Sequence, residues 1–163
     1  MSVINQFSYI LMTAGVLLGS YIFLRRRFRI RLPAVALIQF GFGAIFVTGF
    51  FLLRPGASTV SDFDVAHATI NNGTPTFVEF FSNYCAGCIA VEPIVDRVVS
   101  QIEGEFDVIR VDIHTTIGRE MRTEYELSFT PEFVLFNADG QEVWRDHVPP
   151  SSSQLDSARA VVQ

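Results

Sequence analysis

The chain is poor in metal-binding side chains: its 163 residues include only two cysteines and three histidines, and it has no lysine at all. A structural zinc site needs four protein ligands, and a catalytic one needs three and a water. The cysteines form a single pair, and His67, His114 and His147 fall in separate predicted elements without ligand spacing. These absences argue against a zinc centre and leave arginine as the only strongly basic side chain.

Acidic residues are also missing from the start of the chain. The first 54 residues carry six arginines and no acidic residue, a charge of about +6, whereas the rest carries six arginines and all 17 acidic residues, about −11. The second segment is long enough for one compact domain. Its acidity argues against nucleic acid and against docking flat on an anionic lipid surface.

Two apolar runs without any charge, residues 7–24 and 33–53, fill most of the first segment. As helices they would be about 27 and about 31 Å long, which is enough to cross a hydrocarbon core of about 30 Å. The intervening residues 25–31 (RRRFRIR) contain five arginines. The pattern predicts a transmembrane hairpin over residues 1–54, followed by a short linker at 55–61.

The arginine loop also predicts an orientation, because basic loops are retained in the cytoplasm. Both termini, and with them the acidic domain, are then expected on the extracytoplasmic side of a plasma or thylakoid-type membrane. A signal peptide over the first apolar run is an alternative, although residues 1–6 have no basic residue and no small-residue cleavage site follows. A twin-arginine export signal at residues 25–28 and an inverted topology are the other two alternatives.

The first apolar run contains a Gly-x-x-x-Gly pattern at Gly15 and Gly19. Such pairs allow two helices to approach closely within a membrane. We expect this face to pack within the hairpin, with dimerisation as the alternative.

The two cysteines, Cys85 and Cys88, lie between an apolar run at 76–81 and a helical pattern at 89–102. At a strand-to-helix junction a Cys-x-x-Cys pair indicates a redox dithiol. Residues three apart share one face of the first helical turn, close enough to bridge. The first cysteine lies at the helix N-terminus, where free N–H groups and the macrodipole favour the thiolate that performs disulfide exchange. A purely structural bridge would close only a tiny loop and add little stability.

Residues 62–163 resemble the thioredoxin family in motifs that occur in the family's order and spacing. The matching features are the strand TFVEFF at 76–81, the dithiol CAGC at 85–88, Pro93 in the following helix, FTPEFVLF at 129–136, and the turn at Asp139-Gly140. The resemblance implies an α/β thioredoxin-like fold, with a mixed central sheet covered by helices on both faces. We expect helices at 62–71, 86–102, 117–125 and 154–162, and strands at 76–81, 106–112, 133–136 and 142–145.

The resemblance also implies roles for single residues. Cys85 would attack the substrate disulfide and Cys88 would resolve the mixed disulfide. Pro131 would be a cis-proline that lies beside the dithiol and presents backbone to the substrate, and Pro131 and the preceding Thr130 would orient the substrate. Tyr84 replaces the family's usual tryptophan and either packs beside the loop or shapes the substrate groove.

Glu79 aligns with the family's buried acidic residue, but the lysine that often partners this residue is replaced by Val108. Burial without a partner would favour the protonated form of Glu79, which would suit a proton acceptor for Cys88. Glu92 is expected to be a solvated charge, and the histidines are expected on the surface or in helices without a role.

These features together predict a membrane-anchored thiol–disulfide oxidoreductase, similar to tethered bacterial and thylakoid thioredoxin-like proteins, some of which serve cytochrome c maturation. No cofactor or metal is expected, because the cysteines carry the electrons. The predicted partners are protein disulfides or dithiols, the lipid bilayer and an electron partner, since neither span contains a cysteine or a histidine pair. That partner would be a membrane dithiol carrier for a reductase, or a quinone-linked protein for an oxidase. The alternative is a binding or assembly module on the same fold.

Overall fold

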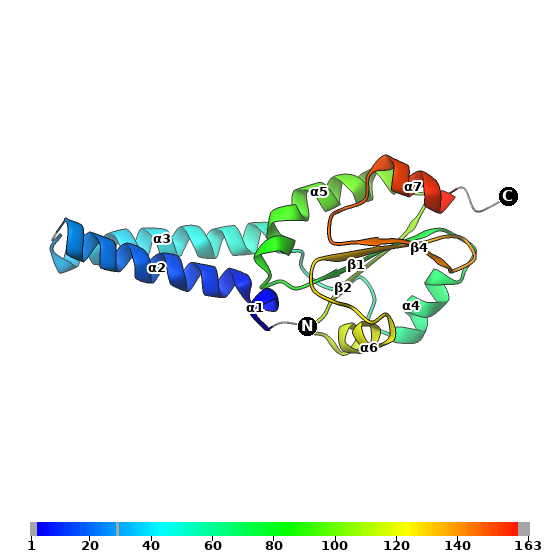
Figure 1. Cartoon of the computed structure of the whole chain (residues 1–163), viewed down its shortest axis with the longest axis horizontal. Coiled ribbons are helices and arrows are strands. Elements are labelled where there is room, and N and C mark those ends of the chain that lie inside the picture. The colour runs from blue at the N-terminus through cyan, green and yellow to red at the C-terminus, as the bar shows by residue number, and fades with distance from the viewer. Residues whose placement is uncertain (1–2, 29, 160–163) are drawn as a thin grey trace.

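Two long helices extend from one end of an α/β domain in the computed structural model, which describes residues 3–28 and 30–159 (Figure 1). A short helix α1 (Val3–Gln6) precedes α2 (Ser8–Arg27), and α3 (Leu32–Leu53) returns to the domain. Both long helices are long and apolar enough to cross a membrane, and almost none of their side chains is buried. Helix α2 continues three residues into the predicted arginine loop, whose Arg29 lies outside the described residues.

Polar contacts hold the two long helices together. The side-chain nitrogen of Gln39 donates to Ser20 Oγ at 3.0 Å and to the carbonyl of Leu17 at 3.2 Å. A methyl group added to Gly15 or Gly19 would meet no atom within 4 Å, so the expected glycine packing within the hairpin is wrong. These two glycines face away from α3.

The domain contains a four-stranded mixed sheet in the order β2-β1-β3-β4. Strands β1 (Thr76–Phe81) and β2 (Asp107–Asp112) are parallel, whereas β3 (Glu132–Phe136) runs antiparallel to both β1 and β4 (Glu142–Asp146). Gly140, in the predicted turn between β3 and β4, has a positive φ of 74°. Every expected strand is present within one residue of its predicted bounds.

Helices cover both faces of this sheet, as the sequence predicts (Figure 1). Helices α4 (Phe63–Ile70) and α6 (Thr116–Glu124) pack on the side of Val78 and Phe80. Helix α5 (Ala86–Ile102) and helix α7 (Ser152–Arg159) pack on the side of Phe77. Helix α7 begins two residues before the prediction, and the predicted end at 160–162 lies outside the described residues. All six residues of β1 are buried, as expected for a central strand covered on both faces.

The segment between the long helices and the domain is held against the edge strand β2. Thr59 exchanges hydrogen bonds with the backbone of Arg110, and the hydroxyl of Ser58 accepts from the N–H of Asp112 at 2.9 Å. The carboxamide of Asn83, beside the dithiol, pairs with the N–H and carbonyl of Gly56 at 2.9 and 2.7 Å. The N-terminal end of α2 and the C-terminal end of α3 therefore lie at the dithiol end of the sheet.

Candidate active site at the end of strand β1

Cys85 occupies the N-cap of α5, directly after β1 and a short turn. Its Sγ accepts the N–H of Cys88 at 3.3 Å, which satisfies one of the free donors of the first helical turn. Both cysteines are free thiols with exposed fractions of 1% and 0%. The helix begins and ends at the predicted residues and contains Pro93 in its interior.

The two sulfurs differ strongly in acidity. A hydrogen bond from the Cys88 thiol, the N–H groups of Gly87 and Cys88, and the Thr130 side chain together outweigh burial and lower the pKa of Cys85 to about 6. Burial, reinforced by the neighbouring Cys85 sulfur, raises the pKa of Cys88 far above that of an ordinary thiol. The pair therefore holds one thiolate and one thiol at neutral pH, with the charge on Cys85.

The peptide bond between Thr130 and Pro131 is cis, as predicted, and the carbonyl of Thr130 lies 3.5 Å from the Cys85 Sγ. A methyl group on Gly87 would lie 3.4 Å from the Pro131 ring and 3.7 Å from Cys85 Sγ. Such a methyl group would be in ordinary van der Waals contact with both, so Pro131 lies directly against the dithiol loop.

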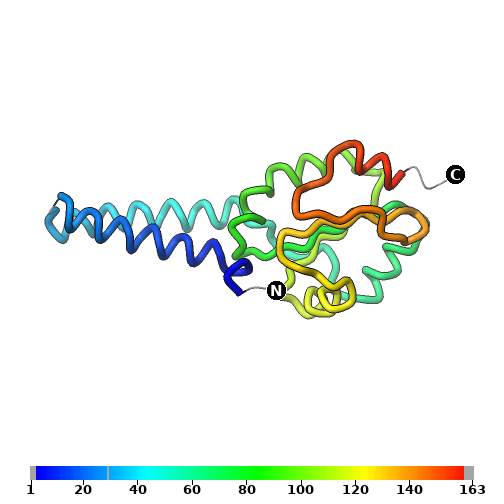
Figure 2. Tube along the Cα trace, viewed as in Figure 1, coloured from blue at the N-terminus to red at the C-terminus, as the bar shows by residue number. Residues whose placement is uncertain are grey.

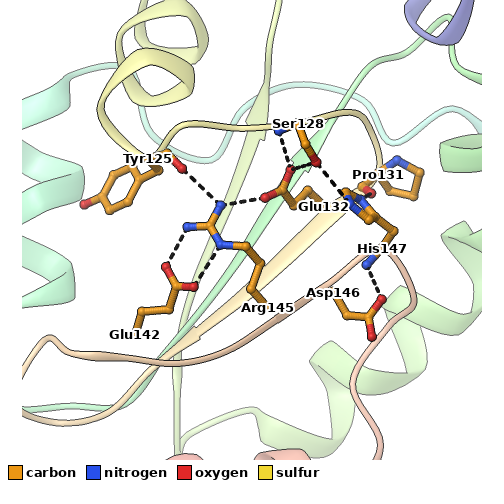
Figure 3. Close-up of polar contacts among 8 residues, drawn as sticks. All are labelled: Tyr125, Ser128, Pro131, Glu132, Glu142, Arg145, Asp146 and His147. Atoms are coloured by element: carbon orange, nitrogen blue, oxygen red, sulfur yellow. Dashed lines mark hydrogen bonds and ion pairs between the residues drawn. The ribbon is translucent and has the colours of Figure 1, made fainter. Parts of the chain in front are cut away.

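An ion-pair network behind the cis-proline loop, drawn in Figure 3, fixes its position. Arg145 binds Glu132 at 2.5 Å and Glu142 at 2.6 Å, and the buried Glu132 accepts the N–H of Ser128 at 2.9 Å. Nδ1 of His147 lies 2.8 Å from the carbonyl of Pro131. His147 thus contacts the functional loop, although the sequence gives it no role.

Glu79 has a basic partner, and the expectation that it lacks one is wrong. Nε of Arg110 lies 2.5 Å from Glu79 Oε2. In the parallel ladder Arg110 stands directly opposite Glu79, whereas Val108 stands opposite Phe77. The arginine on β2 thus supplies the positive charge that the family's lysine would supply at position 108.

The prediction that Glu92 is a solvated charge is also wrong. It is only 8% exposed, and both of its carboxylate oxygens accept from Arg110 Nη2 at 2.7 Å. Asp96, one turn further along α5, completes the group at 3.6 Å from Arg110. One guanidinium therefore contacts three carboxylates between β1, β2 and α5, and burial raises the pKa of Glu92.

The ionisation of Glu79 is finely balanced. Burial raises the pKa of Glu79 to about 7, although Arg110 acts in the opposite direction. Its Oε1 atom has no hydrogen-bond partner among the described residues. Glu79 can therefore take up or release a proton near neutral pH.

Tyr84 precedes the dithiol and is 37% exposed. Its ring stacks on Phe7 and Phe50 at centroid distances of 5.7 and 6.0 Å. His114, for which no role is expected, contacts Phe7 and Tyr84 and lies 2.9 Å from Ser82 Oγ. The side chains of Tyr84 and His114 thus connect the dithiol loop to the ends of the long helices that meet the domain.

A model of the thioredoxin family matches residues 57–156. The chain belongs to the thioredoxin family. Thioredoxins act on protein disulfides, and this chain is a thiol–disulfide oxidoreductase with a thioredoxin-like fold. The matched region contains the dithiol, the cis-proline loop and the Arg110 cluster, whereas α1, α2 and α3 lie outside it.

Individual thioredoxins agree with this assignment. The thioredoxin of Pyropia yezoensis is 30% identical over 81 residues, covering 50% of this chain and 74% of its own length. Thioredoxin 1 of a Nostoc species is 28% identical over 87 residues, covering 53% and 78%. A solved structure from work on thiol resolution in yeast mitochondrial 1-Cys peroxiredoxin, via glutathione/thioredoxin systems, superposes with a TM-score of 0.51 at 14% identity. It covers 63% of this chain and 92% of that one, which supports the fold.

Replacing Cys88 by alanine should raise the pKa of Cys85 from about 6 toward 9.0, the value of an ordinary thiol, because the largest stabilising hydrogen bond is lost. Thiolate absorbance in the ultraviolet, followed against pH, measures this directly, since Cys85 is then the only cysteine. Ser100→Ala, at an exposed position of the same helix, is the control and should leave the first titration step in place. A midpoint still near 6 in Cys88→Ala would assign the stabilisation to the backbone N–H groups instead.

Proposed function

We propose that the chain is a membrane-anchored thiol–disulfide oxidoreductase that exchanges disulfides of extracytoplasmic proteins. The proposal divides it into a transmembrane hairpin (1–54), a linker (55–61) and a catalytic domain (62–163). The observation that carries the chemistry is the helix N-cap occupied by Cys85, with its lowered pKa, beside the protonated Cys88. The thiolate is the nucleophile in disulfide exchange, so this pair is prepared for two successive displacements.

In the first displacement, the Cys85 thiolate attacks one sulfur of the substrate disulfide and the other sulfur leaves as a thiolate. Cys88 then loses its proton and attacks Cys85 Sγ, which releases the second substrate sulfur and leaves a Cys85–Cys88 disulfide. The substrate gains two electrons and leaves as two thiolates, which take protons from the solvent, whereas the cysteine pair loses two electrons and the single proton of Cys88. Thr130, Pro131 and Tyr84 would orient the substrate chain at the dithiol.

Glu79 would receive the proton of Cys88 in the second displacement. Its burial, its pKa of about 7 and its unpartnered Oε1 support this role. Arg110 holds the carboxylate in place and limits the cost of ionising it inside the domain.

The exposure of the long helices supports membrane anchoring. Phe40 and Leu52 of α3 are 78% and 76% exposed, and Leu11, Leu18 and Ile45 are also solvent-facing. An apolar surface of this extent is unfavourable in water, and a bilayer would cover it. The arginines at the far end of α2 favour a cytoplasmic tip and an extracytoplasmic domain.

Neither long helix contains a cysteine or histidine, so the electrons must come from, or go to, another protein. A membrane dithiol carrier would recharge a reductase, and a quinone-linked protein would accept electrons from an oxidase. Maturation of cytochrome c is one setting that requires such a tethered reductase, and the resemblance to tethered thioredoxin-like proteins favours it.

The full-length Cys88→Ser protein should accumulate mixed disulfides with its substrates through Cys85, because the resolving thiol is gone. Cys85→Ser should accumulate none, and both variants should lose the ability to reduce insulin disulfides. Non-reducing electrophoresis of the protein in detergent measures the first result. If Cys85 still reacts with alkylating reagents but no mixed disulfide forms, the domain is a binding module rather than an exchange enzyme.

Glu79→Gln should slow resolution of the mixed disulfide roughly ten- to a hundredfold, the usual scale of a lost proton acceptor. It should also remove the dependence of that step on pH near 7. Stopped-flow mixing of reduced protein with a disulfide substrate separates attack from resolution. Glu92→Gln is the matched control because it removes the other close carboxylate from Arg110, and an equal loss in both variants would indicate only a disturbed ion cluster.

Protease added to spheroplasts of a bacterial host should digest the domain, whereas in inside-out membrane vesicles the domain should be protected. Replacing the arginines of residues 25–31 by glutamine should mix the two orientations, because the charge that selects the topology is removed. Protection in spheroplasts and digestion in inverted vesicles would establish the opposite topology.

A further inference from the structure

The N-terminal segment, residues 5–9, lies on the dithiol rather than away from it. In Figure 2 the blue start of the chain meets the domain where α5 begins, and the N–H of Ala86 there donates to Ser8 Oγ at 2.9 Å. Ser82 donates to the carbonyl of Gln6 at 3.0 Å, and the N–H of Tyr9 donates to the carbonyl of Tyr84, also at 3.0 Å. The segment is therefore bonded on both sides of Cys85 in the chain.

Asn5 makes the most specific of these contacts, because its carboxamide pairs with the backbone of Thr130. Nδ2 donates to the Thr130 carbonyl at 2.9 Å, and Oδ1 accepts the Thr130 N–H at 3.0 Å and its hydroxyl at 3.1 Å. A carboxamide carries the same donor and acceptor as a peptide group. The pair of bonds to one residue's N–H and carbonyl is the one that an extended chain makes in an antiparallel ladder. Asn5 thus imitates the backbone of a peptide bound beside the cis-proline.

Phe7 closes the aromatic side of the site. Its ring lies 5.7 Å from the Tyr84 ring and 5.3 Å from the His114 ring, and Tyr84 in turn stacks on Phe50 of α3. Beneath this cover Cys85 is 1% exposed. A thiolate must approach a substrate sulfur in direct contact, and a sulfur so enclosed cannot reach a disulfide on another protein.

We propose that residues 5–9 form an autoinhibitory strap that occupies the substrate groove, so that exchange requires its displacement. The observed rate at Cys85 is then the intrinsic rate multiplied by the fraction of molecules with an open strap. A protein partner that offers an extended backbone to Thr130 replaces the bonds of Asn5 and stabilises the open form. A small disulfide offers no such backbone, so the strap selects protein partners over small thiol oxidants. The statement that a protein partner opens the strap rests on the proposed exchange function, whereas the occlusion of Cys85 by the strap does not.

The test measures how fast iodoacetamide alkylates Cys85 in the reduced full-length protein, in detergent micelles at a pH well above 6. Asn5→Ala removes all three bonds to Thr130 and should raise the rate roughly tenfold, given the net strength of such bonds. Asn5→Asp, which keeps the size of the side chain but cannot donate to the Thr130 carbonyl, and Phe7→Ala should raise it too. Ser20→Ala is the matched control, since Ser20 lies in α2 beyond residues 5–9 and its hydroxyl bonds only to Leu17 and Gln39 among the described residues.

Thiolate absorbance must show an unchanged Cys85 titration in each variant, so that a faster reaction reports access rather than acidity. Rates equal to that of the unmodified protein in both Asn5→Ala and Phe7→Ala would overturn the strap. Insulin reduction by the same samples separates the two proposals. Faster alkylation without reduction in any sample would support the strap and contradict the exchange function, whereas normal reduction with unchanged alkylation would contradict the strap alone.

Discussion

The hydrogen bond from the Cys88 N–H to the Cys85 sulfur is the interaction on which the site depends. It makes the Cys85 sulfur the cap of α5, and together with the stronger hydrogen bond from the Cys88 thiol it places the negative charge on that sulfur. The end of β1, the start of the helix and the reactive atom therefore lie together. The cap also holds Cys88 one turn inside the helix, buried and protonated. A cysteine outside the N-cap would lack these donors and the favourable end of the helix dipole.

Arg110 supplies the positive charge that stabilises the carboxylates beneath the dithiol. A planar guanidinium with five donors can bind several carboxylates at once, which a lysine ammonium does less well. In this chain without lysine, that geometry lets one residue on β2 serve Glu79 on β1 and both Glu92 and Asp96 on α5. The arrangement links the central strand to the active-site helix by charge as well as by packing, and it keeps Glu79 near the balance between its two protonation states.

Local patterns predict much of this molecule. The apolar run before the dithiol and the helical periodicity after it suffice for β1 and α5, whereas the cis-proline at Pro131 follows from the resemblance to the thioredoxin family. The partner of Glu79 and the burial of Glu92 are misjudged because they depend on the register between parallel strands and on which face of α5 meets the sheet. The contact between Asn5 and Thr130 spans 125 residues and leaves no trace in the sequence, since a lone asparagine before an apolar helix is unremarkable.

The strap and the anchor bear on the direction of electron flow when considered together. Stabilising the thiolate of Cys85 favours the reduced form of the pair, which by itself makes the disulfide form a better electron acceptor. In the proposed extracytoplasmic location, a reduced pair would be consumed by small oxidants if it were exposed, but both cysteines are buried beside residues 5–9. Because the proposed strap continues directly into α2, the opening would occur at the end of the proposed membrane hairpin that meets the domain. A partner that docks there could release the dithiol where it is used, so a closed strap over the buried pair fits a protected reductase better than a freely accessible oxidase.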